Sequence, residues 1–352
     1  MTQKLNRGVF VVDEANSPLW RAARSHAAAG NISVISANEF FSTTQMTKRI
    51  SSVDPEFIIF SWRGAFDAVL SSRRARLKLR SSNVRIFLLI PDLIGIHHVS
   101  QIENQRVSMA DGVLVTSEEL KEKYLSMYGV ENLQTLHDYP PYEEIDLINL
   151  EKITRNPNQI VWVGNSKWGA RAGFVDHKGL KSLAIPVIEE IRKVKLDLNF
   201  IVIDSAVEKL PYELVLRTIR ESACLIFTSE SEGTGLPLIE SATLGTPLVT
   251  VRVGVAPEIL KGELARFISS RDIESFSNEV LEVLSDVQRY SELILNAGMK
   301  YRSDVVLDFQ ALELNKFSQG QWRVHGMPRN FIQCLKWKYR WLRYLRTRFL
   351  IR

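Results

Sequence analysis

The sequence predicts an α/β protein in which two parallel sheets are each covered by helices. Short apolar runs alternate along the chain with helical patterns, the order expected when parallel strands are joined by crossover helices. The runs form two series, separated by Pro140 and Pro141 and by a polar segment from Glu151 to Asn158. At 352 residues, the chain is long enough for two domains that each bury a core.

Each series supplies five expected strands. In the first they lie at 8–12, 32–35, 57–61, 84–90 and 112–116, and in the second at 159–163, 198–203, 224–227, 247–251 and 265–268. A capping box from Thr116 to Glu119 predicts a helix that runs to about Tyr128. We place the domain boundary near residue 155, which gives domains of residues 1–155 and 156–310 and a C-terminal extension of residues 311–352. Ligands bind at the carboxyl ends of parallel strands, so we expect the site in the cleft that those ends face.

Composition narrows the class of protein. The two cysteines, Cys224 and Cys334, give no basis for a disulfide framework or a cysteine-based zinc site, so we expect a reducing, cytoplasmic environment. The apolar run from Gly8 to Val12 is too short for a signal peptide, and no run approaches the length of a membrane span. We therefore expect a protein that is neither secreted by that route nor integral to a membrane.

The segment Glu-Gly-Thr-Gly-Leu-Pro-Leu-Ile-Glu, from Glu232 to Glu240, is the strongest functional signal. It follows the expected buried strand at 224–227, and Pro237 is expected to be the first residue of a helix. Free N–H groups and the positive dipole end at such a helix start favour an anion, while Gly233 and Gly235 allow a ligand to approach the backbone. A purely structural role without a ligand is also open, since the dipole alone stabilises a Glu in a first turn and glycines are common in tight turns.

This segment resembles the signature of family 4 retaining glycosyltransferases of the GT-B fold, in which two Glu separated by seven residues bracket a Gly-x-Gly-Leu-Pro turn. The resemblance extends from Leu225 to Val249 and to the loop from Gly254 to Glu258. It implies two Rossmann-like domains facing each other across a cleft, the first for the acceptor and the second for a nucleotide-sugar donor. It further implies that Glu232 contacts the donor sugar, that Glu240 contacts the nucleotide ribose, and that the donor is bound along Gly233, Thr234, Gly235 and Leu236.

A basic loop opens the second series. In the resembled family, the first strand ends Val-Gly-Arg and a later Lys-Gly follows, and the Arg and Lys neutralise the leaving diphosphate. Here Lys178 and Gly179 match, whereas Gly164 is followed by Asn165, which supplies no charge. The resemblance therefore implies that Lys178 is catalytic and that Gly164 and Asn165 lie beside the donor. Either Lys167 or Arg171 substitutes for the missing Arg, or the phosphate clamp is weaker.

The chemistry implied by this resemblance needs no cofactor and no metal. A lysine and a helix N-terminus can stabilise the charge that develops on the diphosphate, and the sequence contains no Asp-x-Asp motif. The resemblance implies that the leaving phosphate itself accepts the proton of the acceptor hydroxyl on the same face of the sugar. A protein nucleophile is then not required.

The acceptor side is less specific in sequence. Asp92 ends a strong strand and His98 follows in the adjoining loop, where the resembled family often places a His or Asp near the reacting sugar, so His98 is the catalytic candidate here. The other interpretation, which the residue types favour, is an exposed loop His and an Asp that serves a turn. The family's glycine-rich loop after the first strand is replaced by residues 13–17. Trp62 and Arg63, after the third strand, either line the cleft or pack.

The C-terminal extension carries the basicity of the chain. Residues 314–352 contain 10 Lys and Arg and no Asp or Glu, which leaves 35 basic against 40 acidic residues elsewhere. Apolar residues recur there at helical spacing with basic residues on another side, the pattern of a basic amphipathic helix at a membrane surface. The apolar set is Phe331, Leu335, Leu342, Leu345 and Phe349, the basic set is Lys336, Arg340 and Arg343, and Trp337 and Trp341 lie at the flanks.

A second basic run, Arg73, Arg74, Arg76, Lys78 and Arg80, lies in the first domain. Basic residues near an anionic leaflet contribute about 1 kcal/mol each, so both runs favour docking on an anionic membrane surface. Two other interpretations of the tail are open. Its apolar face packs on the protein or on a partner subunit, or its basic face binds nucleic acid, although no recognised nucleic-acid fold accompanies it.

Taken together, these features lead us to expect a metal-independent, retaining, hexosyltransferase-like enzyme that is cytoplasmic and peripheral on the inner face of the plasma membrane. Its donor is a nucleotide diphosphate sugar, and its acceptor is lipid-linked or a growing polysaccharide or other glycan. A complex with other biosynthetic enzymes is compatible with this expectation. The alternatives are a nucleotide-sugar epimerase or hydrolase on the same scaffold, and a non-catalytic nucleotide-sugar-binding subunit, for which Asn165 argues.

Overall fold

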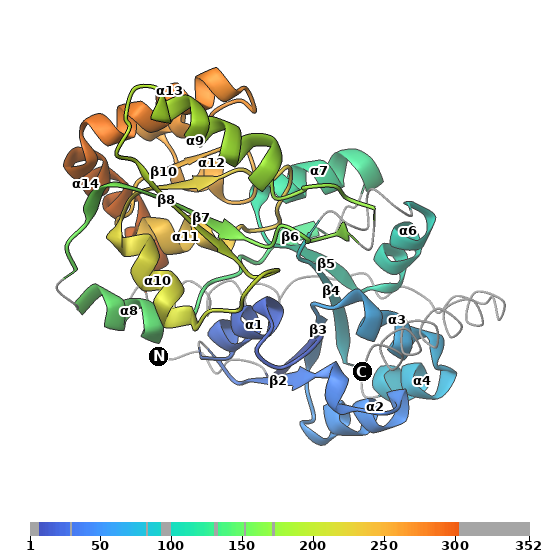
Figure 1. The fold of residues 1–352 in the computed structure, drawn as a ribbon. Coiled ribbons are helices and arrows are strands. Elements are labelled where there is room, and N and C mark those ends of the chain that lie inside the picture. Colours follow the sequence, from blue (N-terminus) through green and yellow to red (C-terminus); the bar gives the residue numbers. More distant parts are fainter. Residues whose placement is uncertain are drawn as a thin grey trace.

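The computed structural model describes residues 7–28, 30–81, 84–92, 100–129, 133–150, 153–170 and 173–302. Two parallel sheets form the cores of two lobes, one coloured blue to teal and one coloured green to orange in Figure 1. The expected C-terminal helix, within residues 311–352, lies outside the described residues, as do His98 and Arg171. None of the helices in the described part of the chain combines the length and apolar character of a membrane span.

The first lobe contains a six-stranded sheet in the order β2-β1-β3-β4-β5-β6. All of its strand pairs are parallel, and β1 lies between β2 and β3 in the register Val9 to Ser33 and Val9 to Ile58. The strands are β1 (Gly8–Val12), β2 (Ile32–Ser36), β3 (Phe57–Phe60), β4 (Arg85–Ile90), β5 (Gly112–Val115) and β6 (Leu133–Thr135). Five of them were predicted; β6 was missed because three residues are too short to show a hydrophobic pattern.

Helices connect these strands. They are α1 (Pro18–Ala28), α2 (Thr43–Ser52), α3 (Arg63–Ser71), α4 (Arg73–Ser81), α6 (Ser100–Met109) and α7 (Glu118–Tyr128), with a 3₁₀ turn, η1, at Ala37–Glu39. The predicted capping box of α7 is wrong by one residue, because Ser117, not Thr116, caps the helix and accepts from the N–H of Leu120 at 3.2 Å. Thr116 instead lies buried just past the end of β5. Arg76, assigned to a basic surface on α4, is also buried, and its guanidinium donates to the carbonyl of Leu70.

The second lobe contains a four-stranded sheet in the order β10-β9-β7-β8, again with parallel pairs. Its strands are β7 (Asn156–Gly164), β8 (Asn199–Asp204), β9 (Ser222–Phe227) and β10 (Leu248–Thr250). The fifth expected strand, 265–268, is wrong: a 3₁₀ segment, η4 (Gly262–Phe267), occupies it, and Ile268 makes a single bridge to Thr250. The remaining elements are the π-helical turn η3 (Leu180–Ala184), α9 (Ile185–Arg192), α10 (Tyr212–Glu221), α11 (Leu236–Thr243), α12 (Ala256–Ile259), α13 (Ile273–Ser285), α14 (Val287–Gly298) and η5 (Met299–Tyr301).

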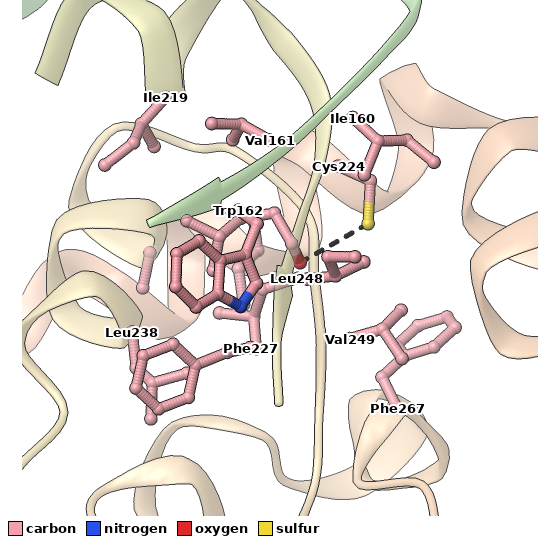
Figure 2. Close-up of a cluster of buried hydrophobic side chains, with 14 of the residues drawn as sticks. Ile160, Val161, Trp162, Ile219, Cys224, Phe227, Leu238, Leu248, Val249 and Phe267 are labelled. Carbon is pink, nitrogen blue, oxygen red and sulfur yellow. Dashed lines mark hydrogen bonds between the residues drawn. The ribbon is translucent and has the colours of Figure 1, made fainter. Parts of the chain in front are cut away.

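Buried apolar side chains of β7, β9 and β10 form the core of the second lobe (Figure 2). Trp162 is fully buried there, and its indole N–H donates to the hydroxyl of Thr228 at 3.0 Å, just past the end of β9. The thiol of Cys224 is buried in the same cluster, and burial raises its pKa to about 12. This cysteine therefore acts as a small apolar core residue.

The connection between the lobes packs with the second core. Tyr139 precedes α8 (Tyr142–Leu150), and both Tyr139 and the α8 side chains Ile145 and Ile148 are buried in the second hydrophobic cluster. The sheets themselves separate between Thr135, at the end of β6, and Asn156, at the start of β7. The boundary at residue 155 stays a prediction. The helix α8 lies before this boundary in sequence, but its buried side chains pack in the core of the second lobe.

A buried ionic network ties α3, α6 and α7 together in the first lobe. The carboxylate of Glu103 is fully buried and accepts from Arg63 at 2.9 Å, from Arg106 at 2.7 Å and from the hydroxyl of Tyr124 at 2.7 Å. Burial alone would raise the pKa of Glu103, but the two guanidinium groups hold it below its usual value. Arg63 also pairs with Asp92 at 2.8 Å, at the end of β4, so this arginine packs in the first lobe and fixes the start of the following loop.

Replacing Glu103 should destabilise the first lobe strongly. Glu103→Ala leaves Arg63 and Arg106 buried and short of a carboxylate, which costs about 3 kcal/mol of unfolding free energy. Urea denaturation followed by circular dichroism measures the change. Asp54→Asn, which removes an exposed pair with Arg7, is the control and should change the free energy by less than about 1 kcal/mol. Equal effects of the two variants would contradict a structural role for the network.

Candidate functional site

The loop between β9 and α11 presents an open helix start. Gly235 precedes α11 with φ +75°, a left-handed conformation that glycine adopts without strain. The helix begins at Leu236, one residue before the predicted Pro237, and Pro237 lies in its first turn. The N-cap residue Gly235 has no side chain that could cap the helix, the N–H of Leu238 donates to the carbonyl of Gly235 at 2.8 Å, and Leu236 and Pro237 are half-buried. The partial positive charge of the helix start is therefore available to an anion.

Lys178 and Glu232 meet at the loop that precedes this helix. The ammonium group of Lys178 donates to the carboxylate of Glu232, and both side chains are largely shielded, with exposed fractions of 13% and 14%. The same ammonium group lies 4.9 Å from the centre of the Trp168 ring. Lys178 was predicted as a catalytic residue from sequence. Trp168 was missed, because an aromatic residue in a loop carries no motif of its own. The structure thus brings one cation and one carboxylate together at the site.

An aromatic cluster fixes the segment that carries Lys178. The ring of His177 stacks on Trp168 at 4.6 Å and lies 4.9 Å from Phe174, and its Nε2 atom lies 3.1 Å from the carbonyl oxygen of Ser231. Burial lowers the pKa of His177, which favours its neutral form. Gly179 has φ +68°, and a Cβ atom there would collide with the carbonyl oxygen of Thr228. The backbone on both sides of Lys178 is therefore anchored to the loop after β9.

Glu240 occupies a different environment from Glu232. It is only 4% exposed, on α11, and accepts a hydrogen bond from the hydroxyl of Tyr212 at 2.7 Å. Burial raises the pKa of Glu240. Arg21 of α1, in the first lobe, lies with its guanidinium carbon 5.1 Å from the Tyr212 ring centre. The structure thus places Glu240 beside Tyr212, away from the Lys178 pair, and contact of both acids with one ligand stays a prediction.

The described residues of the turn after β7 are held by hydrogen bonds among themselves and to the segment after β8. The carbonyl of Gly164 accepts from the N–H of Ser205 at 2.9 Å, and the side chain of Asn165 accepts from the N–H of Lys167 at 3.0 Å, so Asn165 acts as a turn residue. Lys167 is exposed and interacts with Asp204. Although burial raises the pKa of Asp204, hydrogen bonds from the turn and the charge of Lys167 hold it below its usual value. The roles of Gly164, Asn165 and Lys167 toward a donor stay predictions.

Gly233 makes room for the first lobe. A Cβ atom at Gly233 would collide with the carbonyl oxygen of Pro91 and with the hydroxyl of Thr116, which lie at the ends of β4 and β5. The neighbouring Thr234 is 5% exposed, and its hydroxyl lies 3.3 Å from the carbonyl oxygen of Thr116 and 3.4 Å from Oδ2 of Asp138. The sequence led us to expect that Gly233 allows a ligand to approach the backbone, and this stays a prediction. The structure shows that Pro91 and Thr116 approach Gly233 closely.

A second contact joins the lobes through Glu258 of α12. Its Oε2 atom lies 2.7 Å from Nε2 of His137, and its Oε1 atom accepts from the N–H of Glu118 at 3.1 Å. We call Thr116, Glu118, His137, Asp138, Thr234 and Glu258 the cross-lobe cluster. Sequence reasoning missed its first-lobe members, because residues about 100 positions apart along the chain meet only when the two sheets face each other.

Asp138 is the most perturbed acid of the cross-lobe cluster. It is 7% exposed, and burial raises its pKa to about 7, although the Thr234 hydroxyl and His137 act in the opposite direction. Its carboxyl group therefore changes charge near neutral pH. A buried carboxylate of this kind is stable only where neighbouring donors compensate for lost hydration.

The remaining first-lobe predictions have mixed outcomes. The polar residues after β1 cap α1: the Ser17 hydroxyl donates to Asp13 at 2.6 Å and accepts from the N–H of Trp20 at 3.1 Å. Trp62 packs against the first hydrophobic core. Within the described residues, no group of three or more His, Cys, Asp or Glu is placed to hold a metal ion.

Comparisons with known proteins agree with this architecture. Residues 186–298 match the model of the family described as glycosyl transferases group 1, which covers most of the second lobe. A search of curated proteins found no significant match.

Solved structures resemble the chain at low identity. Anabaena HepE in complex with UDP and glucose is 12% identical with a TM-score of 0.62, covering 89% of this chain and 99% of HepE. Apo OtsA is 10% identical with a TM-score of 0.64, covering 90% and 100%. TarM is 14% identical with a TM-score of 0.57, and the match covers 79% of this chain but spans only 58% of TarM. The fold is therefore the expected GT-B fold.

The raised pKa of Asp138 predicts a pH-dependent stability difference. In the unfolded chain the carboxyl group of Asp138 has its ordinary pKa of 3.8, and in the folded protein its pKa is about 7, so folding favours the protonated form and wild-type stability falls as the pH rises between these values. Asp138→Asn lacks this loss. Its unfolding free energy relative to wild type should rise between pH 4 and pH 7 by a few kcal/mol at most, on the order of 1.4 kcal/mol per pH unit.

Chemical denaturation at half-unit pH steps checks this expectation. Asp54→Asn, at an exposed position in the same lobe, controls for the amide substitution itself. A difference between wild type and Asp138→Asn that stays constant from pH 4 to pH 8 would show that Asp138 titrates alike in both states.

Proposed function

We propose that this protein is a retaining glycosyltransferase, which moves a sugar from a nucleotide diphosphate sugar to an acceptor hydroxyl without a metal ion. The observation that carries the proposal is the Lys178–Glu232 pair at the loop that leads into α11, a helix whose N-cap residue is the glycine Gly235. One cationic group, one helix dipole and one carboxylate are the parts needed to hold a diphosphate next to a sugar. The group 1 glycosyl transferase match over residues 186–298 contains Glu232 and α11 and supports the same activity.

In the proposed reaction, charge develops on the diphosphate as the bond from the anomeric carbon to the leaving oxygen breaks. The ammonium group of Lys178 and the start of α11 stabilise this charge. The leaving phosphate oxygen accepts the proton of the acceptor hydroxyl, whose oxygen forms the new bond on the same face, so the configuration is retained. Glu232, paired with Lys178 without a ligand, binds hydroxyl groups of the donor sugar once Lys178 turns to the phosphates.

The nucleotide is proposed to extend from this point toward Glu240. Tyr212 occupies one oxygen of the Glu240 carboxylate, and the other is proposed to accept from the ribose hydroxyls. HepE, which shares the fold, was solved with UDP and glucose, and this makes UDP sugars the first donors to test. Because Asn165 supplies no charge and Lys167 lies beside Asp204, the phosphate clamp proposed among the described residues rests on Lys178 and α11.

The acceptor and the location are extensions of this proposal. The basic amphipathic sequence after residue 314 supports docking on an anionic membrane at its cytoplasmic face. A surface-bound enzyme of this kind meets lipid-linked or growing polysaccharide acceptors. The second candidate function is a non-catalytic nucleotide-sugar-binding subunit, which Asn165 in place of a cationic residue favours.

Loss of Lys178 or Glu232 should abolish most turnover. Purified protein is incubated with a panel of UDP, GDP, ADP and dTDP sugars, with and without membrane extract, and release of the nucleoside diphosphate is measured. Lys178→Ala and Glu232→Ala should each lower the rate about a hundredfold, since one electrostatic partner of the transition state is typically worth roughly 3 kcal/mol. Lys193→Ala, which removes an exposed lysine paired with Glu190 in the same lobe, is the matched control.

The same assay separates the alternatives. Release that depends on the extract supports transfer, and release without any acceptor indicates a hydrolase or, if the sugar is altered, an epimerase. Nucleotide binding without any turnover indicates the non-catalytic subunit. Full activity in both Lys178→Ala and Glu232→Ala would overturn the proposed site.

Membrane docking predicts a specific dependence on lipid charge. The full chain should float with liposomes that contain anionic lipid and remain in solution with neutral liposomes, because Lys and Arg near an anionic surface contribute about 1 kcal/mol each. Replacing Lys336, Arg340 and Arg343 by Glu should abolish flotation. Indifference of the wild-type protein to anionic liposomes would contradict docking, and a shift of labelled RNA in a gel would point to nucleic acid.

A further inference from the structure

The first lobe touches the tips of both loops that flank the candidate donor site. Thr234 lies in the loop that also carries Glu232, and its hydroxyl faces Thr116 and Asp138 of the first lobe at 3.3 and 3.4 Å. Glu258 follows the next loop, after β10, and is held by His137 at 2.7 Å and by the N–H of Glu118 at 3.1 Å. Both loops are therefore connected to the first lobe by polar contacts.

The two loops are also locked to each other. The N–H of Val255 donates to the carbonyl of Thr234 at 3.0 Å, and a Cβ atom at Gly254, which has φ +51°, would collide with the same carbonyl. Gly233, beside Thr234, has no space for a Cβ atom against Pro91 and Thr116. A displacement of either loop therefore moves the other, and with them the residue before Gly233, which is Glu232.

The first-lobe side of the contact is rigid. Thr116 directly follows β5, and His137 and Asp138 follow β6, so all three extend from strands of one parallel sheet. The hydroxyl of Thr116 is buried without a hydrogen-bond partner within the described residues and faces Gly233. Strand ends that belong to a hydrogen-bonded sheet hold their side chains more precisely than free loops do.

Asp138 belongs to a chain of charged and titratable groups on several elements. Its charge interacts with His137 on its own segment. His137 in turn interacts with His26 on α1 and contacts Glu258 on α12, whose other oxygen accepts from the N–H of Glu118 at the start of α7. His26 is fully buried, and burial together with His137 lowers its pKa to about 3, so it stays neutral at physiological pH. Among these groups, Asp138 is the one whose carboxyl lies against the Thr234 hydroxyl.

We propose that Asp138 is a positioning residue of the donor site: from the first lobe it holds Thr234, and through Thr234 the loop that carries Glu232, in the conformation that binds the donor. This inference rests on the proposed function. Asp138 touches the loop rather than the ligand, so it acts through Thr234. His137 supports the same arrangement through Glu258. The donor site is then complete only when the two lobes meet.

The proposal predicts weaker donor binding without this carboxyl group. The probe is whichever of UDP, GDP, ADP or dTDP raises the melting temperature of the wild type most. Its dissociation constant, measured by titration calorimetry, should rise about three- to tenfold in Asp138→Ala and in Thr234→Val, as expected for loss of one hydrogen bond. The double variant should be no weaker than either single variant, because both remove the same contact. Asp54→Asn is the control and should bind as wild type does.

The pH profile separates positioning from a general loss of structure. A carboxylate accepts a hydrogen bond more strongly than a neutral carboxyl group. Wild-type affinity for the probe should therefore improve as the pH rises through about 7, the pKa to which burial raises Asp138. Asp138→Asn, which keeps an acceptor oxygen, should bind within about threefold of wild type at pH 6 and lack the improvement. Turnover with the matching sugar donor should show the loss mainly in KM rather than in kcat.

The outcomes are distinguishable. If the wild type binds none of the four nucleoside diphosphates, the proposed function falls and this inference falls with it. If the wild type binds one of them while Asp138→Ala and Thr234→Val bind it equally well, this inference alone is overturned. Retention of the full pH step in Asp138→Asn also overturns it, whereas additive losses in the double variant would show that Asp138 and Thr234 act independently.

Discussion

The ion pair between Lys178 and Glu232 is the interaction on which the candidate site depends. It brings together two segments 54 residues apart, one after β7 and one after β9, and the second of them leads into α11. The ring of Trp168, on which the buried His177 stacks, lies next to the ammonium group of Lys178. Gly179 lets the backbone after Lys178 lie against Thr228. Each partner stabilises the charge of the other, because neither charge is stable alone in so shielded a position.

Three carboxyl groups near this site differ because their surroundings differ. Glu232 is paired with a lysine, whereas Glu240 accepts only a phenolic hydroxyl, and burial raises its pKa. Asp138 lies 3.4 Å from the Thr234 hydroxyl and interacts with His137, and burial raises its pKa to about 7. Donor binding is thus proposed for Glu232 and Glu240, and positioning of the Thr234 loop from the first lobe for Asp138. Electrostatic environment, rather than residue type, makes this division.

Contacts in the folded protein explain several residues to which the sequence patterns gave other roles. Gly233 is required by Pro91 and Thr116, and Gly235 by its left-handed backbone. Thr116, expected to cap α7, is instead part of the lobe contact, and Ser117 caps the helix. Arg63, considered as a cleft residue, closes an ionic network with Asp92 and Glu103. Packing within the first lobe imposes the role of Arg63, and packing against the facing lobe imposes those of Gly233 and Thr116.

The sequence by itself determined the two parallel sheets, most of their strands, and the segment from Glu232 to Glu240 as the strongest functional signal. These features depend on local periodicity, on turn residues and on short-range spacing, which a linear chain displays directly. Only the tertiary structure decided that Lys178 pairs with Glu232, that Glu240 faces Tyr212, and that Asp138 reaches Thr234. The first two contacts join residues 54 and 28 positions apart within the second lobe, and the third joins residues 96 positions apart because the strand ends of two separately built sheets face each other.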